Sequence, residues 1–98
     1  MSQFDEIIHQ PLRLKIMAAL CQLKVFDETK LDFSELKEVT GATDGNLGAH
    51  ILTLEKAGYV RVEKSFVGRK PNTAVHIEEA GRIAFARHAA ALNALLNP

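Results

Sequence analysis

Residues 43–58, TDGNLGAHILTLEKAG, are the stretch of sequence that decides the fold. Thr43 is a residue type that caps helix N-termini, and Gly58 is one that commonly follows a helix C-terminus. Between them, three apolar residues recur at the spacing of one buried helical face: Leu47, Ile51 and Leu54. The stretch therefore predicts a helix that ends at about residue 57 and packs one face against a core.

A shorter helix is expected directly before this one, over residues 34–40. Asp32 or Ser34 can cap its start, and Gly41 can end it in a tight turn. Two short helices joined by a turn that contains glycine form the helix-turn-helix pattern, here over residues 34–57. An ordinary helical hairpin that binds nothing would look the same, so the residues that follow are needed to distinguish the two.

The hydrophobic period changes from 3.6 to 2 after the longer helix. Residues 59–66 alternate as a β-strand does, residues 67–71 (VGRKP) carry the glycine and proline of a turn, and residues 73–77 are expected to return as a second strand. A β-hairpin over residues 59–77, directly after a helix-turn-helix, is the wing of a winged helix. The predicted fold is accordingly α+β, mostly α: a winged helix-turn-helix with flanking N- and C-terminal helices in one domain, residues 1–98.

Helices are expected on both sides of this pattern. Pro11 suits the first turn of a helix, and the apolar positions after it predict a helix over residues 11–23. Leu31 and Phe33 are expected in a very short strand before the helix-turn-helix. A last helix is expected over residues 78–96, where the hydrophobic spacing becomes helical again.

The last helix is apolar on two faces, which indicates that it packs against two partners. One is the core of its own domain, and the other is expected to be a second copy of the chain. A homodimer is therefore predicted, although alanine also occurs in helices simply because it favours them. The residues expected at the dimer interface are Phe4, Ile7, Ile8, Ile83, Ala86, Ala90 and Leu95.

The chain of 98 residues has 12 basic and 12 acidic residues, so its formal net charge at pH 7 is zero. A neutral total argues against nucleic acid only if the charges are evenly spread, because phosphates respond to a local patch. Residues 61–70 hold four basic residues and one acidic residue, whereas residues 27–44 hold six acidic and two basic ones. The wing is therefore the electropositive part of the chain.

Two sets of residues are expected to contact DNA. Opposite the buried face of the longer helix lie small and polar side chains, of which Asn can pair with adenine, and Thr and Ala can contact the thymine methyl group. The wing supplies cations for the phosphate backbone or the minor groove. A solvated polar surface is the alternative for each residue. The predicted contacts are Thr43, Gly45, Asn46, Ala49, His50, Thr53 and Lys56 on the helix, and Lys64, Arg69 and Lys70 on the wing.

Several stretches of the chain resemble one family. Residues 43–50 and 54–60 look like the recognition helix of small winged-helix prokaryotic transcriptional regulators related to MarR and ArsR proteins, residues 63–71 are similar to their wing, and residues 9–16 to their first core helix. The chain departs from the family at residues 48–49, glycine and alanine, where a polar or basic residue is common. The resemblance implies a winged-helix fold, a homodimer, transcriptional control, and DNA contacts at Thr43, Asn46, His50, Arg69 and Lys70.

Other functions find no support in the sequence. The one cysteine, Cys21, excludes an internal disulfide, fits a reducing, cytoplasmic location, and is expected to be a buried structural thiol. No CxxC or HxxxH spacing indicates a metal site, and no cofactor motif is present. No nucleophile with a partner base and acid indicates an enzyme. No apolar run reaches the roughly 18 residues of a membrane span, and no signal peptide is expected.

Double-stranded DNA and a second copy of the chain are therefore the expected partners, with no membrane involved. The sequence indicates no particular small-molecule effector. The alternative function is a winged-helix adaptor that binds another protein and not DNA, since a fold alone does not determine function. The acidic residues 27–44 and the neutral total charge would suit an adaptor.

Overall fold

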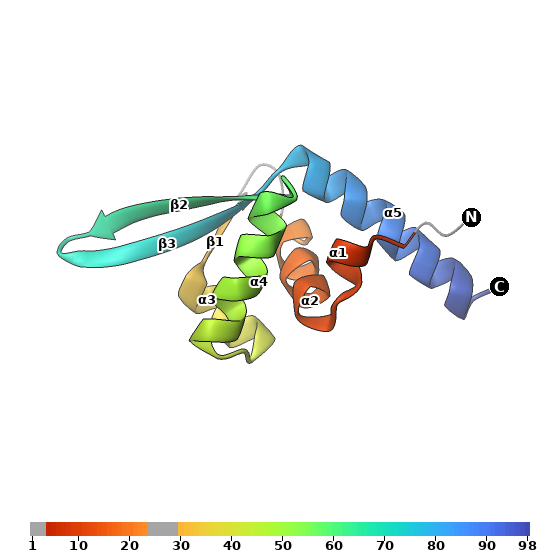
Figure 1. Ribbon diagram of the computed structural model, residues 1–98, viewed down its shortest axis with the longest axis horizontal. Helices are drawn as coiled ribbons and strands as arrows, with labels where there is room; N and C mark the ends of the chain where they lie inside the picture. Colours follow the sequence, from red (N-terminus) through yellow and green to blue (C-terminus); the bar gives the residue numbers. More distant parts are fainter. Residues whose placement is uncertain (1–3, 24–29) are drawn as a thin grey trace.

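The computed structural model describes residues 4–23 and 30–98. A small helical core lies at the centre, a β-hairpin projects from one side of it, and the last helix projects from the other (Figure 1). The molecule is accordingly elongated, with principal extents of 52 × 30 × 22 Å. In chain order the elements are α1 (Glu6–His9), α2 (Pro11–Cys21), β1 (Lys30–Asp32), α3 (Phe33–Thr40), α4 (Asp44–Lys56), β2 (Val60–Val67), β3 (Lys70–Ile77) and α5 (Glu79–Leu96). The winged helix-turn-helix predicted from the sequence is confirmed.

The helix-turn-helix consists of α3 and α4, and polar groups at the helix ends determine where each begins and stops. Glu35 Oε1 accepts a hydrogen bond of 3.0 Å from the backbone N–H of Asp32 at the start of α3. Gly41 ends α3 in the left-handed conformation, with φ 71°. Thr43 caps α4, because its Oγ1 accepts a hydrogen bond of 3.3 Å from the backbone N–H of Asn46. Of the two residues predicted to cap α3, Asp32 and not Ser34 is the N-cap, and the predicted helix ends at Gly41 and Thr43 are confirmed.

The wing is the hairpin of β2 and β3, and β1 pairs with the other edge of β3, so the strand order is β1-β3-β2. All neighbouring strands are antiparallel. The wing is longer than predicted, because β2 continues through Val67 and β3 already begins at Lys70. Gly68, with φ 66°, supplies the left-handed residue that so short a turn requires.

Two further details of the sheet differ from the sequence prediction. Phe33 does not belong to the short strand, since Asp32 caps α3 and Phe33 is already its first residue. Pro71 lies within β3 and not in the turn. It is tolerated there because β1 pairs only with residues 74–76, so β3 has an open edge at Pro71 and needs no second ladder hydrogen bond.

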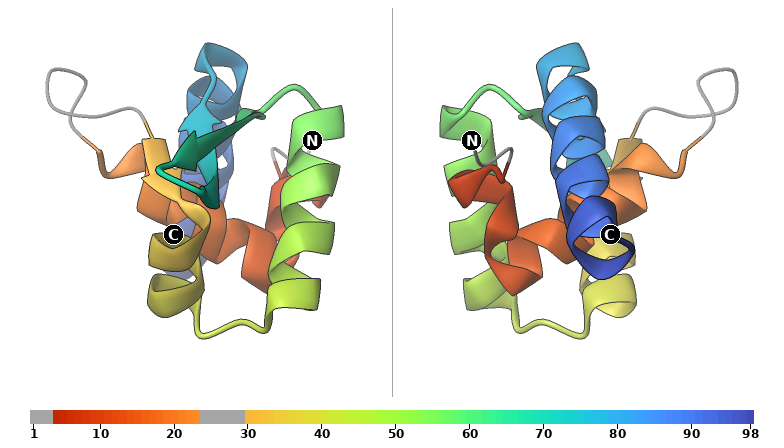
Figure 2. Two further views of the ribbon diagram at one scale, coloured as in Figure 1. Left: turned by 90° about the vertical axis from the view of Figure 1, so that its left-hand side faces the viewer. Right: turned by 90° about the vertical axis from the view of Figure 1, so that its right-hand side faces the viewer.

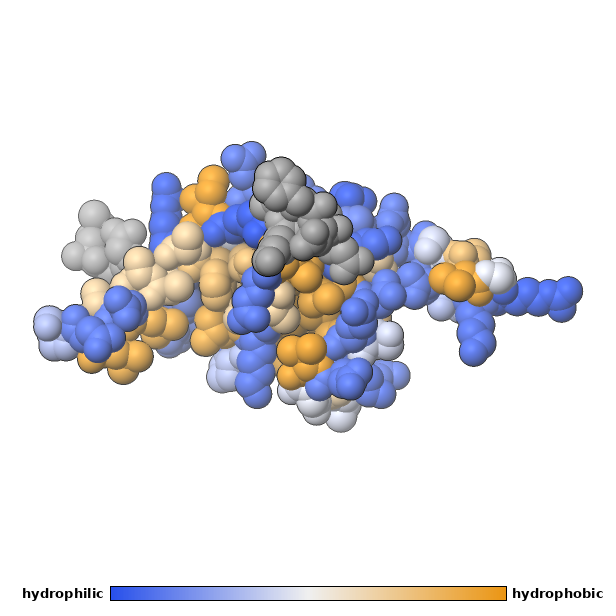
Figure 3. All heavy atoms as spheres, turned by 180° about the vertical axis from the view of Figure 1, so that it is seen from behind, coloured by the Kyte–Doolittle hydropathy of each residue, from blue (hydrophilic) through white to orange (hydrophobic). Residues whose placement is uncertain are grey.

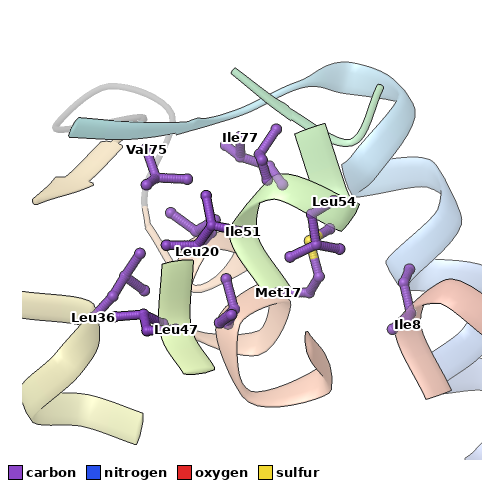
Figure 4. Packing of buried hydrophobic residues seen from close by; sticks show 11 residues of the cluster. Ile8, Met17, Leu20, Leu36, Leu47, Ile51, Leu54, Val75 and Ile77 are labelled. Carbon is purple, nitrogen blue, oxygen red and sulfur yellow. The ribbon is translucent and has the colours of Figure 1, made fainter. Parts of the chain in front are cut away.

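One hydrophobic core joins α2, α3, α4 and the base of the sheet (Figure 4). The predicted buried face of α4 is confirmed, since Leu47, Ile51 and Leu54 are 0 to 4% exposed. Burying each such side chain contributes about 1.5–3 kcal/mol before the entropy cost of ordering it. The core thereby determines which side of α4 faces solvent. Its buried members are Ile8, Ile16, Met17, Leu20, Leu36, Leu47, Ile51, Leu54, Val60, Val75 and Ile77.

The prediction that Ile8 lies at a dimer interface is wrong. Its side chain has no exposed surface and packs in the core of its own chain. Ile8 points into the core because it lies in the short helix α1, and Asp5 Oδ1 caps the first turn of that helix. That oxygen accepts hydrogen bonds from the backbone N–H groups of Ile7 at 2.8 Å and Ile8 at 3.1 Å. Ile7 is half-buried against the same core.

Helix α5 begins in close contact with the loop that follows α4. The backbone N–H of Glu78 donates to the carbonyl oxygen of Tyr59 at 3.1 Å. A Cβ at Gly81 would lie 2.2 Å from that same oxygen, so only glycine permits this approach. Beyond this point α5 runs away from the wing, past α1 and α2 (Figure 1).

His88 joins α5 to the N-terminal segment. Its Nδ1 accepts a hydrogen bond of 3.0 Å from the backbone N–H of Asp5, and its ring lies 5.3 Å from that of His9 and 5.6 Å from that of Phe4, centroid to centroid. Burial lowers the pKa of His88, the neighbouring His9 lowers it further, and Asp5 partly opposes this. The hydrogen bond that Tyr59 donates to Asp5 raises the pKa of Tyr59 to about 12.

Candidate nucleic-acid interface

The surface of α4 that faces away from the core carries the helix residues predicted to contact DNA, with His50 at its edge. Two of them, Gly45 and Ala49, have almost no side chain, so another surface can approach the backbone of α4 closely. Leu52 lies among them and is 48% exposed. The exposed residues are Thr43, Gly45, Asn46, Ala49 and Lys56, and the half-buried ones are His50 and Thr53.

Both threonines of this surface use their hydroxyl groups within the helix. Thr43 Oγ1 accepts the capping hydrogen bond from Asn46. Thr53 Oγ1 donates a hydrogen bond of 3.2 Å to the carbonyl oxygen of Ala49, one turn earlier. The Thr53 hydroxyl proton is therefore engaged, which leaves the methyl group and the oxygen lone pairs for an outside partner. Such a side chain suits a thymine methyl group better than a base acceptor.

His50 is held in place from behind by Arg13 of α2. Arg13 Nη1 lies 2.9 Å from His50 Nδ1, and Arg13 Nε donates to the carbonyl oxygen of Ile7 in α1. Because a guanidinium can only donate, His50 Nδ1 is the acceptor, and the neutral ring carries its proton on Nε2. His50 thus presents a donor, positioned by α2, at the edge of the exposed surface.

An ion pair lies at the N-terminal end of α4. Lys37 Nζ of α3 is 2.7 Å from Asp44 Oδ1, and both side chains are at least 49% exposed. An unpaired Asp44 would oppose an approaching phosphate at this helix end. Lys37 compensates that charge, although an exposed pair of this kind adds little to stability.

The strand register sorts the wing residues onto two faces. Lys64 is paired with Thr73 and Val62 with Val75, and side chains alternate along each strand, so these residues share the face that continues into the core. That face borders an open groove of about 290 Å³ between the wing and α4. Lys70, paired with Val67, lies on the opposite face. The groove is lined by Phe33, Gly48, Ile51, Leu52, Glu55, Val62, Lys64 and Thr73.

The acidic residue of the wing, Glu63, lies on the face away from the groove. His76 Nε2 is 3.1 Å from Glu63 Oε1 across the strands. This hydrogen bond and then the charge of His76 hold the pKa of Glu63 below its usual range, with Arg61 and Lys30 adding to the effect. Glu55, in contrast, lines the groove, as Lys64 does. The groove-facing surface is therefore positive along the wing and mixed at its junction with α4.

Sequence reasoning missed three residues of this region. Arg13 of α2 was not among the residues predicted to contact DNA, yet it contacts His50. Lys37 of α3 forms an ion pair with Asp44 at the start of α4, and Leu52 lines the groove between α4 and the wing. For Leu52 a signal existed, because an apolar residue falls on the otherwise polar side of the predicted helix. Arg13 and Lys37 carry no such signal, since their partners lie on other helices.

The remaining expectations concern chemistry elsewhere in the chain. Cys21 is half-buried, and burial raises the pKa of its thiol, partly opposed by the charge of Arg82. Among residues 4–23 and 30–98, no group of three or more His, Cys, Asp or Glu side chains is placed to hold a metal ion. None of the helices in that part of the chain is long and apolar enough to cross a membrane.

Comparison with known proteins places this geometry in a family. Residues 12–96 match the winged helix DNA-binding domain family. The chain is 36% identical over 80 residues to the uncharacterized protein MJ0432 of Methanocaldococcus jannaschii, covering 82% of each chain.

Solved structures show the same fold. The transcriptional regulator homologue of Pyrococcus horikoshii OT3 superposes with a TM-score of 0.82 at 33% identity, over 95% of this chain and 87% of that one. NadR, solved in complex with 4-hydroxyphenylacetate, superposes with a TM-score of 0.69 at 18% identity, over 93% of this chain and 63% of that one. The resemblance to winged-helix transcriptional regulators is confirmed, and the chain belongs to the winged helix DNA-binding domain family.

Proposed function

We propose that this protein is a cytoplasmic regulator of transcription that binds specific sequences of double-stranded DNA as a homodimer. The observation that carries the proposal is the exposed, small and polar side of α4 next to a cationic wing. The wing projects between α3 and α4 when the molecule is viewed from its tip (Figure 2, left). A B-DNA major groove admits an α-helix, and the adjoining backbone is then within reach of a projecting hairpin.

Each predicted contact has a chemical role in this arrangement. Asn46 pairs with an adenine edge, and Ala49 and Thr53 contact thymine methyl groups. Gly45 allows the close approach, His50 donates from Nε2, and the start of α4 at Thr43 receives a phosphate. Lys56 on α4 and the wing cations Lys64, Arg69 and Lys70 neutralise backbone phosphates, which supplies affinity more than sequence choice.

The homodimer is proposed from the surface of α5. Ile83 is 46% exposed and Leu95 66% exposed, and the neighbouring Leu96 is 75% exposed. Ala86 and Ala90 are exposed on the same helix, and hydrophobic side chains are visible at this end of the molecule (Figure 3). A second copy that covers this helix, together with Phe4 and Ile7, would remove an apolar surface from water.

The proposed mechanism is steric. Two copies related by a two-fold axis place their α4 helices in successive major grooves, about 34–36 Å apart along the DNA. Occupation of such a site at a promoter blocks or assists RNA polymerase. Because each wing contributes few cations, tight binding requires both wings to engage at once, which happens only where both α4 helices also meet their half-sites.

The test is selection of bound duplexes from a random DNA pool, together with light scattering to measure the mass of the free protein. We expect a recurrent two-fold symmetric sequence and the mass of two chains. A pool that shows no enrichment would contradict the proposal and favour the protein-binding adaptor. A monomeric mass with a single enriched half-site would contradict the dimer only.

A further inference from the structure

The tip of the wing carries an aromatic side chain that the core of the protein does not use. Phe66 is 73% exposed and the adjacent Val67 is 68% exposed. Large apolar residues of this kind are usually buried. Figure 3 shows hydrophobic side chains at the end of the wing next to long hydrophilic ones. The Phe66 ring is therefore available for contact with a partner.

The strand register determines the direction of that contact. Phe66 is paired with Pro71, and it follows Lys64 and Val62 at intervals of two residues along β2. It therefore lies on the face of the wing that borders the groove beside α4, beyond the end of the core. Val67 lies on the opposite face. Phe66 and Pro71 thus form an apolar pair on the same side of the wing as the exposed surface of α4.

The charges around this pair indicate the partner. Residues 64–71 contain the bases Lys64, Arg69 and Lys70 and no acidic residue. All three bases are exposed, and none takes part in the ion pairs found among the described residues. An apolar pair at a hairpin tip that also carries unpaired cations is complementary to nucleic acid, which offers stacked bases between phosphates.

We propose that Phe66 and Pro71 act as a wedge that enters the minor groove of double-stranded DNA and partly unstacks one base step. This inference rests on the proposed DNA-binding function and assigns a role to residues outside the predicted contact set. Minor-groove proteins use phenylalanine and proline in this way and kink the duplex. Pyrimidine–purine steps unstack most easily, so the wedge adds a preference for DNA deformability at a position where no base edge is read.

A tryptophan reporter tests the contact directly, because the chain contains no Trp. In Phe66→Trp the indole replaces the wedge, and binding of a duplex recovered by selection should quench its emission strongly through base stacking. In the matched control Val67→Trp, the indole is one residue away on the opposite face and should change little. If Phe66→Trp binds the duplex with the same emission change as the control, the wedge is overturned.

A second measurement reports on the DNA. Phe66→Ala should lower affinity roughly tenfold and reduce the bend measured by energy transfer between dyes at the duplex ends, whereas Val67→Ala should do neither. Circular dichroism confirms that both variants fold. Wild-type protein that binds no DNA would refute the proposed function itself. If the wild-type protein binds and Phe66→Ala bends the duplex as much as wild type does, only the wedge is refuted. A free Phe66→Ala protein with a lower mass than free wild type would also refute the wedge, because the wing tip would then be a contact between copies.

Discussion

Arg13 Nη1 and His50 Nδ1 lie 2.9 Å apart, and this contact joins the first core helix to the exposed edge of α4. The same guanidinium also donates to the carbonyl oxygen of Ile7. One side chain therefore connects the N-terminal segment, a core helix and the candidate DNA-binding helix. Its effects should appear both in stability and in DNA binding.

Substitution of Arg13 by glutamine should lower the free energy of unfolding by about 2 kcal/mol, because hydrogen bonds to a charged donor are lost and two half-buried acceptors are left without it. Urea denaturation measures this change. Lys15→Gln, at an exposed position of the same helix, is the control and should have little effect. Equal losses in the two variants would show that Arg13 contributes only its charge.

Acidification should destabilise the protein through His88. Its folded pKa lies below the ordinary value of 6.5, so the unfolded chain takes up the proton first. The contribution of His88 is therefore complete above pH 6.5 and declines as the pH falls from there through the folded pKa. Protonation also places a donor opposite the backbone N–H of Asp5. Urea unfolding across this pH range, with a ring titration by NMR, should show this decline.

The control for this titration is His76→Gln. His76 lies on the wing beside Glu63, far from the junction that His88 forms with the N-terminal segment. The loss of stability below pH 6.5 should persist in that variant. A stability that does not change between neutral pH and the folded pKa of His88 would contradict the assignment.

Two glycines should respond oppositely to alanine. Gly81→Ala should destabilise the fold by about 1–3 kcal/mol, because the new methyl would overlap the Tyr59 carbonyl oxygen. Gly45→Ala meets nothing within 4 Å and should stabilise the helix by up to about 1 kcal/mol while weakening DNA binding. Thermal unfolding and mobility-shift titrations separate the two effects. Tighter DNA binding by Gly45→Ala would argue against close approach of α4 to a groove.

The two classes of DNA contact should differ in salt dependence and sequence preference. Lys64→Ala and Arg69→Ala should weaken binding about equally on all duplexes, each reducing the slope of log affinity against log salt by about 1. Asn46→Ala should leave that slope unchanged and relax the preference at one base pair. An unchanged affinity for Arg69→Ala at low salt would contradict the assignment of the wing.

Replacement of Ile83 by glutamate should convert the proposed dimer into a monomer, since it places a charge in the apolar surface of α5. Sedimentation or light scattering measures the mass. Val39→Glu is the matched control, because Val39 is 64% exposed on α3, a different part of the surface. Dissociation by Val39→Glu and not by Ile83→Glu would place the interface elsewhere.

Much of the fold could be predicted from local sequence. Caps at Asp32, Gly41 and Thr43 depend on residues within a few positions, and the change of period marks the wing without any knowledge of its partners. The direction of Ile8 could not be predicted in this way, because helix α1 has too few residues for a periodic signal. The same holds for Gly81, whose need for glycine arises from a carbonyl group 22 positions earlier in the chain.

In the candidate site, too, the features that depend on local sequence could be predicted and those that depend on distant residues could not. The exposed side of α4 follows from helical geometry once three core residues are known, and the structure places the predicted residues there, with His50 at the edge. The directions of the side chains at the tip of the wing could not be predicted, because the sequence suggested strands that ended at residue 66 and resumed at residue 73. Only the observed pairing of Phe66 with Pro71 and of Val67 with Lys70 separates the two faces and shows that Lys64 and Lys70 point to different sides.

The contact between Gly81 and the Tyr59 carbonyl has a consequence for how such a protein diverges. The start of α5 is joined to the loop after α4 by backbone atoms, through that contact and the Glu78 hydrogen bond, so at this point the angle between the two helices does not depend on which side chains Tyr59 and Glu78 carry. If α5 holds the dimer together, this angle sets the distance between binding half-sites. Descendants of one ancestor would then acquire new base preferences readily while inheriting the same spacing on the DNA.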